Sequence, residues 1–131
     1  MEPSDPRRLR IIHLDDDETV LETTRSILMA GGFAVTTTRD PAELLDLHEQ
    51  TFDLVILELL LPHMDGFSVC QSLRREGWAG PMLVATARVI AGHERRILEE
   101  MRTEYLLKPF GPHQLLNRVR LCLAEAAKAG L

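Results

Sequence analysis

Leu9-Arg-Ile-Ile-His-Leu-Asp-Asp-Asp-Glu18 joins a short apolar run to four consecutive acidic residues. The run Leu9–Leu14 is short and rich in isoleucine, which is typical of a buried β-strand. Beyond the acids, apolar residues recur at helical spacing as far as Leu28, and Gly31-Gly32 ends that helix. The stretch therefore predicts one strand–helix unit with carboxylates at the carboxyl end of its strand.

The same alternation continues to the end of the chain. Asp40, Pro41 and Glu43 form a typical helix start, because Asp caps the first turn and Pro fits its first position. Further strands are expected at residues 33–37, 53–57, 81–85 and 105–107, and further helices at 41–49, 67–75, 91–101 and from 112 to about 126. Strict alternation predicts an α/β fold, in which helices cover both faces of a parallel sheet.

Length and composition indicate one globular domain. The chain has 131 residues, of which 45% are hydrophobic and 27% charged, and its net charge is −5. This composition excludes a disordered or disulfide-rich chain, and the negative charge argues against non-specific nucleic-acid binding. The amino-terminal residues lack a signal-peptide pattern, and no apolar run approaches the ~18 residues of a transmembrane helix.

These properties lead to expectations about organisation and location. We expect a flexible leader at residues 1–8, a folded domain over residues 9–127 and a frayed tail at residues 128–131. Cys70 and Cys122 lack the spacing of a zinc or dithiol site, so we expect them to be reduced core residues. The protein is therefore expected in the cytoplasm, without contact to a membrane or to nucleic acid.

Polar side chains stand at the ends of four of the five predicted strands. In chain order they are Asp15 and Asp16, Glu58, Thr86 and Lys108. Each alone has an ordinary explanation, such as a solvated turn, a helix cap or a surface lysine. However, the carboxyl ends of parallel strands share one edge of the sheet, so these side chains should converge. Clustered carboxylates suit Mg²⁺, and a hydroxyl and an ammonium group suit a phosphoryl anion, so we expect a site of this type.

Four motifs, taken together in this order and spacing, resemble the receiver domains of two-component response regulators. They are Ile11-Ile-His-Leu-Asp-Asp-Asp-Glu18, Leu54-Val-Ile-Leu-Glu-Leu-Leu-Leu-Pro-His-Met-Asp-Gly66, Leu83-Val-Ala-Thr-Ala87 and Tyr105-Leu-Leu-Lys-Pro-Phe110. The resemblance extends over nearly the whole chain. It implies a flavodoxin-like (βα)5 fold, a doubly wound parallel sheet with strand order 2-1-3-4-5.

The resemblance also implies a role for each polar residue at this edge. Thr86 and Lys108 match residues that contact the phosphoryl group, and the Lys108-Pro109 bond matches one that is often cis. Tyr105 matches an aromatic switch, which turns inward when the Thr86 hydroxyl is drawn towards phosphate. The implied Mg²⁺ ligands are Asp15, Asp16, Glu58 and the backbone carbonyl of Leu60. We expect any Mg²⁺ binding to be weak.

Glu58 is the main departure from the family pattern, because the family has its phosphoacceptor Asp there. Glu adds one methylene, roughly 1.5 Å, and in-line phosphoryl transfer tolerates little misplacement. We therefore expect poor phosphorylation and partial mimicry of the phosphorylated state, since a carboxylate has less charge and fewer oxygens than a phosphoryl group. Whether Glu58 is natural or engineered stays open. A smaller departure is Met101-Arg102, where the family usually has Gly-Ala.

The leading hypothesis is a receiver-type signalling module without enzymatic activity. Its expected partner is a histidine kinase or a downstream signalling protein, bound through helix 91–101, strand 105–107 and the helix from residue 112. We expect a monomer or a weak homodimer. Two alternatives remain at this stage: a Mg²⁺-dependent phosphatase of the haloacid-dehalogenase type that uses Asp15 and Asp17, and an interaction domain without a metal.

Overall fold

The computed structural model describes residues 8–47 and 52–129, and all structural statements concern these residues. The predicted leader up to residue 7, the end of the second predicted helix and the last two residues of the predicted tail lie outside them. The strands are β1 (Arg10–Leu14), β2 (Ala34–Thr38), β3 (Leu54–Leu57), β4 (Met82–Thr86) and β5 (Thr103–Leu107). The helices are α1 (Glu18–Ala30), α2 (Pro41–Leu47), α3 (Gly66–Arg75), α4 (Gly92–Glu100) and α5 (Pro112–Lys128).

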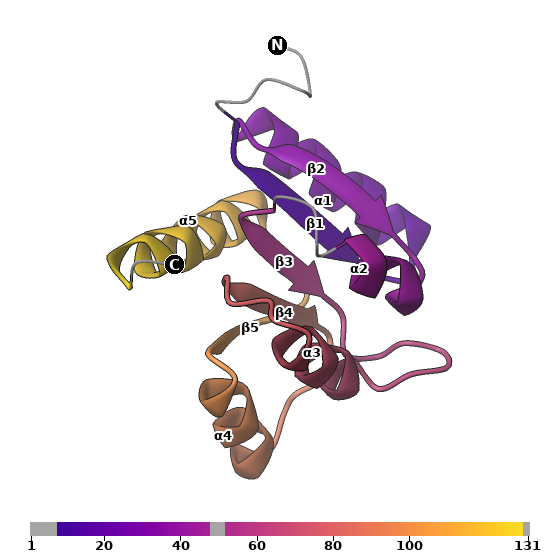
Figure 1. The fold of residues 1–131 in the computed structure, drawn as a ribbon. Coiled ribbons are helices and arrows are strands. Elements are labelled where there is room, and N and C mark those ends of the chain that lie inside the picture. The colour runs from indigo at the N-terminus through magenta and orange to yellow at the C-terminus, as the bar shows by residue number, and fades with distance from the viewer. Residues whose placement is uncertain (1–7, 48–51, 130–131) are drawn as a thin grey trace.

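The five strands form one parallel sheet in the order β2-β1-β3-β4-β5, which confirms the predicted fold class (Figure 1). The register pairs Leu14 of β1 with Leu57 of β3, so the residue that follows each of these strands lies at the same level. Thr86 at the end of β4 pairs in the same way with Leu107 at the end of β5. The topology thus brings the ends of four strands to a common edge.

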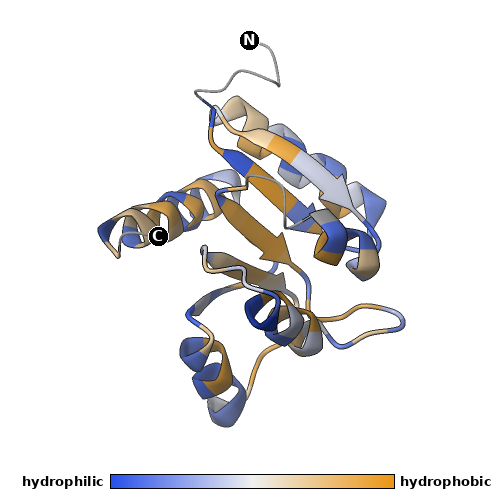
Figure 2. Cartoon of the chain, in the orientation of Figure 1, coloured by the Kyte–Doolittle hydropathy of each residue, from blue (hydrophilic) through white to orange (hydrophobic). Residues whose placement is uncertain are grey.

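Alternating apolar residues of the strands build two separate cores, one on each face of the sheet. One face packs against α2, α3 and α4, and its sheet residues are Ile12, Leu14, Val55, Leu57, Met82 and Val84. The other face packs against α1 and α5, and its sheet residues are Ile11, Leu54, Ile56, Leu83, Ala85 and Leu106. Figure 2 shows β3 as a hydrophobic strand at the centre. Burial on both faces explains why the central strands are nearly continuous apolar runs.

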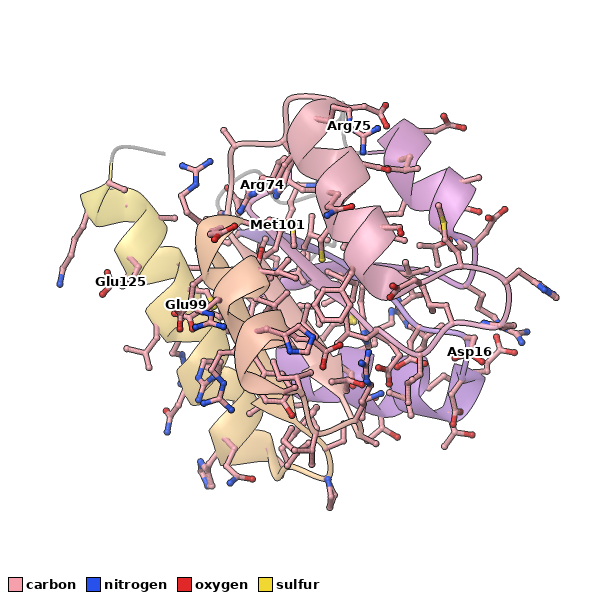
Figure 3. The ribbon with its side chains drawn as sticks, turned by 90° about the horizontal axis from the view of Figure 1, so that it is seen from below. Asp16, Arg74, Arg75, Glu99, Met101 and Glu125 are labelled. Atoms are coloured by element: carbon pink, nitrogen blue, oxygen red, sulfur yellow. The ribbon has the colours of Figure 1, made fainter. Side chains whose placement is uncertain are left out.

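The fifth strand begins at Thr103, two residues before the predicted start at Tyr105. Thr103 pairs with Met82 and Glu104 with Leu83, so pairing with β4 adds two polar residues to the strand. These residues lack the apolar character from which a strand is predicted. The preceding turn contains Met101 and Arg102, and Arg102 takes a positive φ of 54°. The Arg74 guanidinium holds this turn, because its Nε donates to the Met101 carbonyl at 2.8 Å (Figure 3).

Candidate functional site

The ends of β1, β3 and β5 meet in a three-residue charged cluster. The Lys108 Nζ donates to Asp15 Oδ2 at 2.7 Å and to Glu58 Oε1 at 3.0 Å. Asp15 and Glu58 are 1% and 5% exposed, and the Lys108 side chain is 17% exposed. One ammonium group thus pairs with two buried carboxylates, and this pairing offsets part of the cost of burying them. The predicted convergence of these three residues is therefore observed.

The remaining carboxylate oxygens are bound by backbone amides. Asp15 Oδ1 accepts from the Asp17 N–H at 3.0 Å. Glu58 Oε2 accepts from the N–H groups of Leu59 at 2.7 Å and of Leu60 at 3.1 Å. Every oxygen of the two buried carboxylates thus has a donor, which is what low exposure demands of charged groups.

The same contacts set the protonation of the lysine. Burial by itself lowers the pKa of Lys108, but hydrogen bonds and charge from Asp15, followed by those from Glu58, outweigh it and raise the pKa above its usual value. Lys108 is therefore a permanent cation at neutral pH. A group with a raised pKa adds stability that is lost only as the pH rises through that pKa, so this lysine contributes throughout the physiological range.

Thr86 lies next to this cluster but does not bond to it through its hydroxyl. Its residue is fully buried, and its carbonyl accepts from the Lys108 N–H at 2.8 Å. The Thr86 Oγ1 accepts from the Arg88 N–H at 3.2 Å. Because that bond uses only a lone pair, the hydroxyl hydrogen can still be donated to another acceptor.

Tyr105, the predicted switch residue, is half-buried against the core on the α3 side of the sheet. Its hydroxyl donates to the Arg88 carbonyl at 2.8 Å, and the Arg95 guanidinium lies 6.0 Å from the ring centroid. The ring is therefore tied to the segment between β4 and α4. The Lys108-Pro109 bond is cis, as the resemblance implies.

The predicted metal ligands do not form a metal site as they are arranged. Asp15 and Glu58 share the Lys108 ammonium, so a cation already lies between them. Asp16 is half-buried at the rim, beside the start of α1 in Figure 3, and Leu60 is 53% exposed. Over the described ranges, no three His, Cys, Asp or Glu side chains are placed to hold a metal ion. The donor types suit Mg²⁺, but the geometry does not fit it, and no step below depends on a metal.

Arg39 is a rim residue that the sequence reasoning missed. The second strand was expected to end without a polar group for the site, but Arg39 follows β2 directly and reaches across to the acidic turn. Its Nε donates to the Asp16 carbonyl at 3.1 Å, and its Nη1 lies 3.7 Å from Glu18 Oε2. The sequence does show an arginine immediately after the second strand. Its contact with the acidic turn depends on the strand order, however, which places β2 beside β1.

Asp17, the second acid of the phosphatase alternative, has a structural role. Its Oδ1 accepts from the N–H groups of Thr19 at 2.9 Å and Val20 at 3.3 Å, so it caps the amino terminus of α1. N-capping by Asp is worth about 1 kcal/mol and needs no catalytic explanation. The arrangement therefore does not favour a pair of catalytic acids at positions 15 and 17.

His13 lies in β1, two residues before Asp15, and is 1% exposed. Within the described part of the chain, its Nδ1 has no hydrogen-bond partner. Burial lowers the pKa of His13 from 6.5 to about 4, Asp15 opposes this effect, and Lys108 adds to it. The imidazole is therefore neutral in the folded protein at physiological pH.

We expect His13 to destabilise the fold in mild acid. Its pKa is lower in the folded chain than in the unfolded chain, so between pH 6.5 and about 4 the unfolded chain binds the extra proton. Stability should fall with decreasing pH in this window, by up to about 1.4 kcal/mol per pH unit from this residue. Urea denaturation at several pH values should show a shallower dependence for His13→Leu. His113→Leu makes the same replacement at an exposed histidine and is the matched control for the substitution itself. An unaltered slope for His13→Leu would contradict this assignment.

Three comparisons place these observations among known proteins. The family model described as response regulator receiver domain matches residues 11–120. The response regulator MprA of Mycobacterium sp. (strain KMS) is 38% identical over 120 residues, which are 91% of this chain and 52% of that protein. The chain thus spans about half the length of such curated relatives.

Solved structures give the same picture. A CheY-like response regulator receiver domain protein from Methanospirillum hungatei JF-1 superposes with a TM-score of 0.85 at 24% identity, over 93% of this chain and 98% of that chain. The non-phosphorylated HemR receiver domain from Leptospira biflexa superposes with a TM-score of 0.81 at 30% identity, over 88% and 94%. Within residues 8–47 and 52–129, none of the helices combines the length and the apolarity that crossing a bilayer requires.

Proposed function

The chain belongs to the response regulator receiver domain family, and from this premise we propose that it is a signalling receiver that works without phosphorylation of its acceptor position. Receiver domains of two-component systems are signalling modules that act through kinases and downstream effectors. We propose that the receiver domain comprises residues 9–127 and that the protein acts in the cytoplasm. Glu58 takes the place of the acceptor Asp and supplies a carboxylate at this position.

The observation that supports this proposal is the contact of 3.0 Å between Glu58 Oε1 and Lys108 Nζ. With its extra methylene, the Glu58 carboxylate reaches the ammonium group that would otherwise pair with phosphoryl oxygens. A covalent phosphoryl group would need the space and the cation that Glu58 already uses. The Glu58 carboxylate therefore takes the place that a phosphoryl group would fill beside Lys108.

The mimicry is partial, because Glu58 satisfies only one of the two phosphoryl contacts. Its second oxygen turns back to the amides of Leu59 and Leu60 and does not take up the hydroxyl hydrogen of Thr86, whose oxygen accepts from the Arg88 N–H. A carboxylate also carries one charge, against nearly two for a phosphoryl group. The resting state is accordingly intermediate between the two states of a normal receiver.

The output surface is the face formed by α4, β5 and α5. Exposed apolar side chains occur on each of these elements: Ile97, Leu107 and Leu121 are 36%, 41% and 57% exposed. The carbonyl of Tyr105, on β5, accepts a hydrogen bond from Arg118 of α5, so the central residue of the switch lies within this face. We propose that a histidine kinase or a downstream protein docks here, and that the chain is a monomer or a weak homodimer.

Amide chemical shifts test the intermediate state. We compare the unaltered chain with Glu58→Asp alone and with Glu58→Asp saturated with beryllofluoride, which mimics a phosphoryl group on Asp. Amide peaks of α4 and β5 in the unaltered chain should lie between those of the two reference states, because one of two phosphoryl contacts is made. Glu58→Gln removes the charge but keeps the length. It should move the same peaks towards their positions in Glu58→Asp without beryllofluoride. If the peaks of the unaltered chain coincide with those of Glu58→Asp without beryllofluoride, Glu58 does not mimic a phosphoryl group.

A further inference from the structure

The segment Ala87–Ala91 connects β4 directly to α4, and Arg88 is its second residue. The Arg88 N–H donates to the Thr86 Oγ1 at 3.2 Å. The Arg88 carbonyl accepts from the Tyr105 hydroxyl at 2.8 Å. Two residues with predicted roles in the switch thus bond to the same residue, one on each side of its backbone.

The side chain of Arg88 extends this connection to two helices. Its Nη2 pairs with Glu94 Oε2 in the first turn of α4, and its guanidinium lies 5.6 Å from the centroid of the Phe67 ring on α3. The other oxygen of Glu94, Oε1, accepts from the N–H of Ala91, the residue that caps α4. The side chains of Arg88 and Glu94 are 37% and 15% exposed, so this pair is shielded more than an ordinary surface ion pair.

We infer that Arg88 is a positioning residue that couples the hydroxyl of Thr86 to the amino terminus of α4 through its ion pair with Glu94. The inference rests on the proposed function, because it explains how the state of the site reaches the output face. Movement of the Thr86 hydroxyl towards an acceptor at position 58 stretches its bond to the Arg88 N–H. The segment Ala87–Ala91 moves with Arg88, because the buried side chain of Ile90 restricts how far the chain between them can adjust. The Arg88 guanidinium then displaces Glu94 through their ion pair.

The experiment perturbs Thr86 without any phosphoryl chemistry. Thr86→Val is nearly isosteric and removes the acceptor of the Arg88 N–H. We measure how far it shifts the amide resonances of Glu94, Arg95 and Arg96 in the unaltered background and in Arg88→Met. The shift at these α4 amides should fall at least twofold in Arg88→Met, whereas the shift at Lys108 should persist.

Matched variants separate coupling from general damage to the fold. Arg96→Met removes an exposed arginine of α4 and should leave the transmitted shift unchanged. Glu94→Gln should weaken transmission as Arg88→Met does, and Arg88→Lys should restore part of it because the ion pair can still form. The conservative Arg88→Lys and Glu94→Gln variants keep the test decisive if Arg88→Met does not fold.

Two outcomes would overturn the inference: an undiminished α4 shift in Arg88→Met, or the absence of an α4 shift when Thr86→Val is made in the unaltered chain. Neither outcome depends on whether Glu58 mimics phosphate or whether the site can be phosphorylated. Conversely, a result in the Glu58 variants that contradicts mimicry of phosphate does not affect the inferred coupling of Thr86 to α4. Failure of the proposed function and failure of the coupling can thus be distinguished.

Discussion

Glu58→Asp should make the protein a substrate for small phosphoryl donors, with labelling by acetyl phosphate at least 100-fold faster than in the unaltered chain. Asp is shorter by one methylene, so its carboxylate withdraws roughly 1.5 Å from Lys108 and leaves room for phosphoryl oxygens beside the ammonium group. Misplacement of about 1 Å can cost 100-fold in such transfers, and the substitution removes a displacement of this size. Intact-mass spectrometry after incubation with acetyl phosphate, with and without Mg²⁺, measures the effect.

Glu58→Gln is the matched control for this experiment, because it keeps the length of Glu and removes the nucleophilic carboxylate. It should remain unlabelled under all conditions. Labelling of the unaltered chain at a rate close to that of Glu58→Asp would refute the proposed phosphorylation independence. The arms with and without Mg²⁺ also show whether Glu58→Asp gains a requirement for the cation that the present arrangement does not fit.

The second large effect is expected from Lys108→Met, which should lower the free energy of unfolding by about 3 kcal/mol or more. Asp15 and Glu58 are buried side by side, and the lysine is the cation that both of them contact. Removal of one partner from a buried ion pair leaves uncompensated charge, which costs more than the pair itself contributes. Urea denaturation measures the loss, which is a large part of the stability of a domain of this size.

Two further variants identify the origin of this loss. Lys128→Met replaces the chain's other lysine, which is exposed at the end of α5, and should change stability by less than about 0.5 kcal/mol. The double variant Lys108→Met/Glu58→Gln should recover at least about 1 kcal/mol relative to Lys108→Met, because one of the two uncompensated charges is gone. Equal losses for Lys108→Met and Lys128→Met would show that the buried cluster does not depend on its cation.

Much of the fold was predictable from local sequence patterns. The apolar run that ends at Leu14 and the one that ends at Leu57 mark two buried central strands, and Asp40-Pro41 marks a helix start. These signals concern neighbouring residues, so they survive in the folded chain. The start of β5 was less predictable, because Thr103 joins the strand by pairing with Met82 and not through its own apolar character.

The site was predictable in membership but not in its bonding. Asp15, Glu58 and Lys108 were expected to converge, and they do. Two other features were not anticipated. The Thr86 hydroxyl bonds to Arg88, and Arg39 reaches over the acidic turn from a strand that was thought to contribute nothing. Both depend on which loops lie side by side, and spacing along the chain does not encode this directly.

By itself, the sequence determined the alternation of strands and helices, the edge of the sheet that bears polar groups, and the presence of a glutamate at the end of the third strand. It could do so because periodicity, capping and residue identity are local properties. Only the tertiary structure decided that Lys108 satisfies both carboxylates and that their remaining oxygens turn to backbone amides. Those partners lie 93 and 50 residues away from Lys108 along the chain, and the register of the parallel strands brings them within hydrogen-bonding distance.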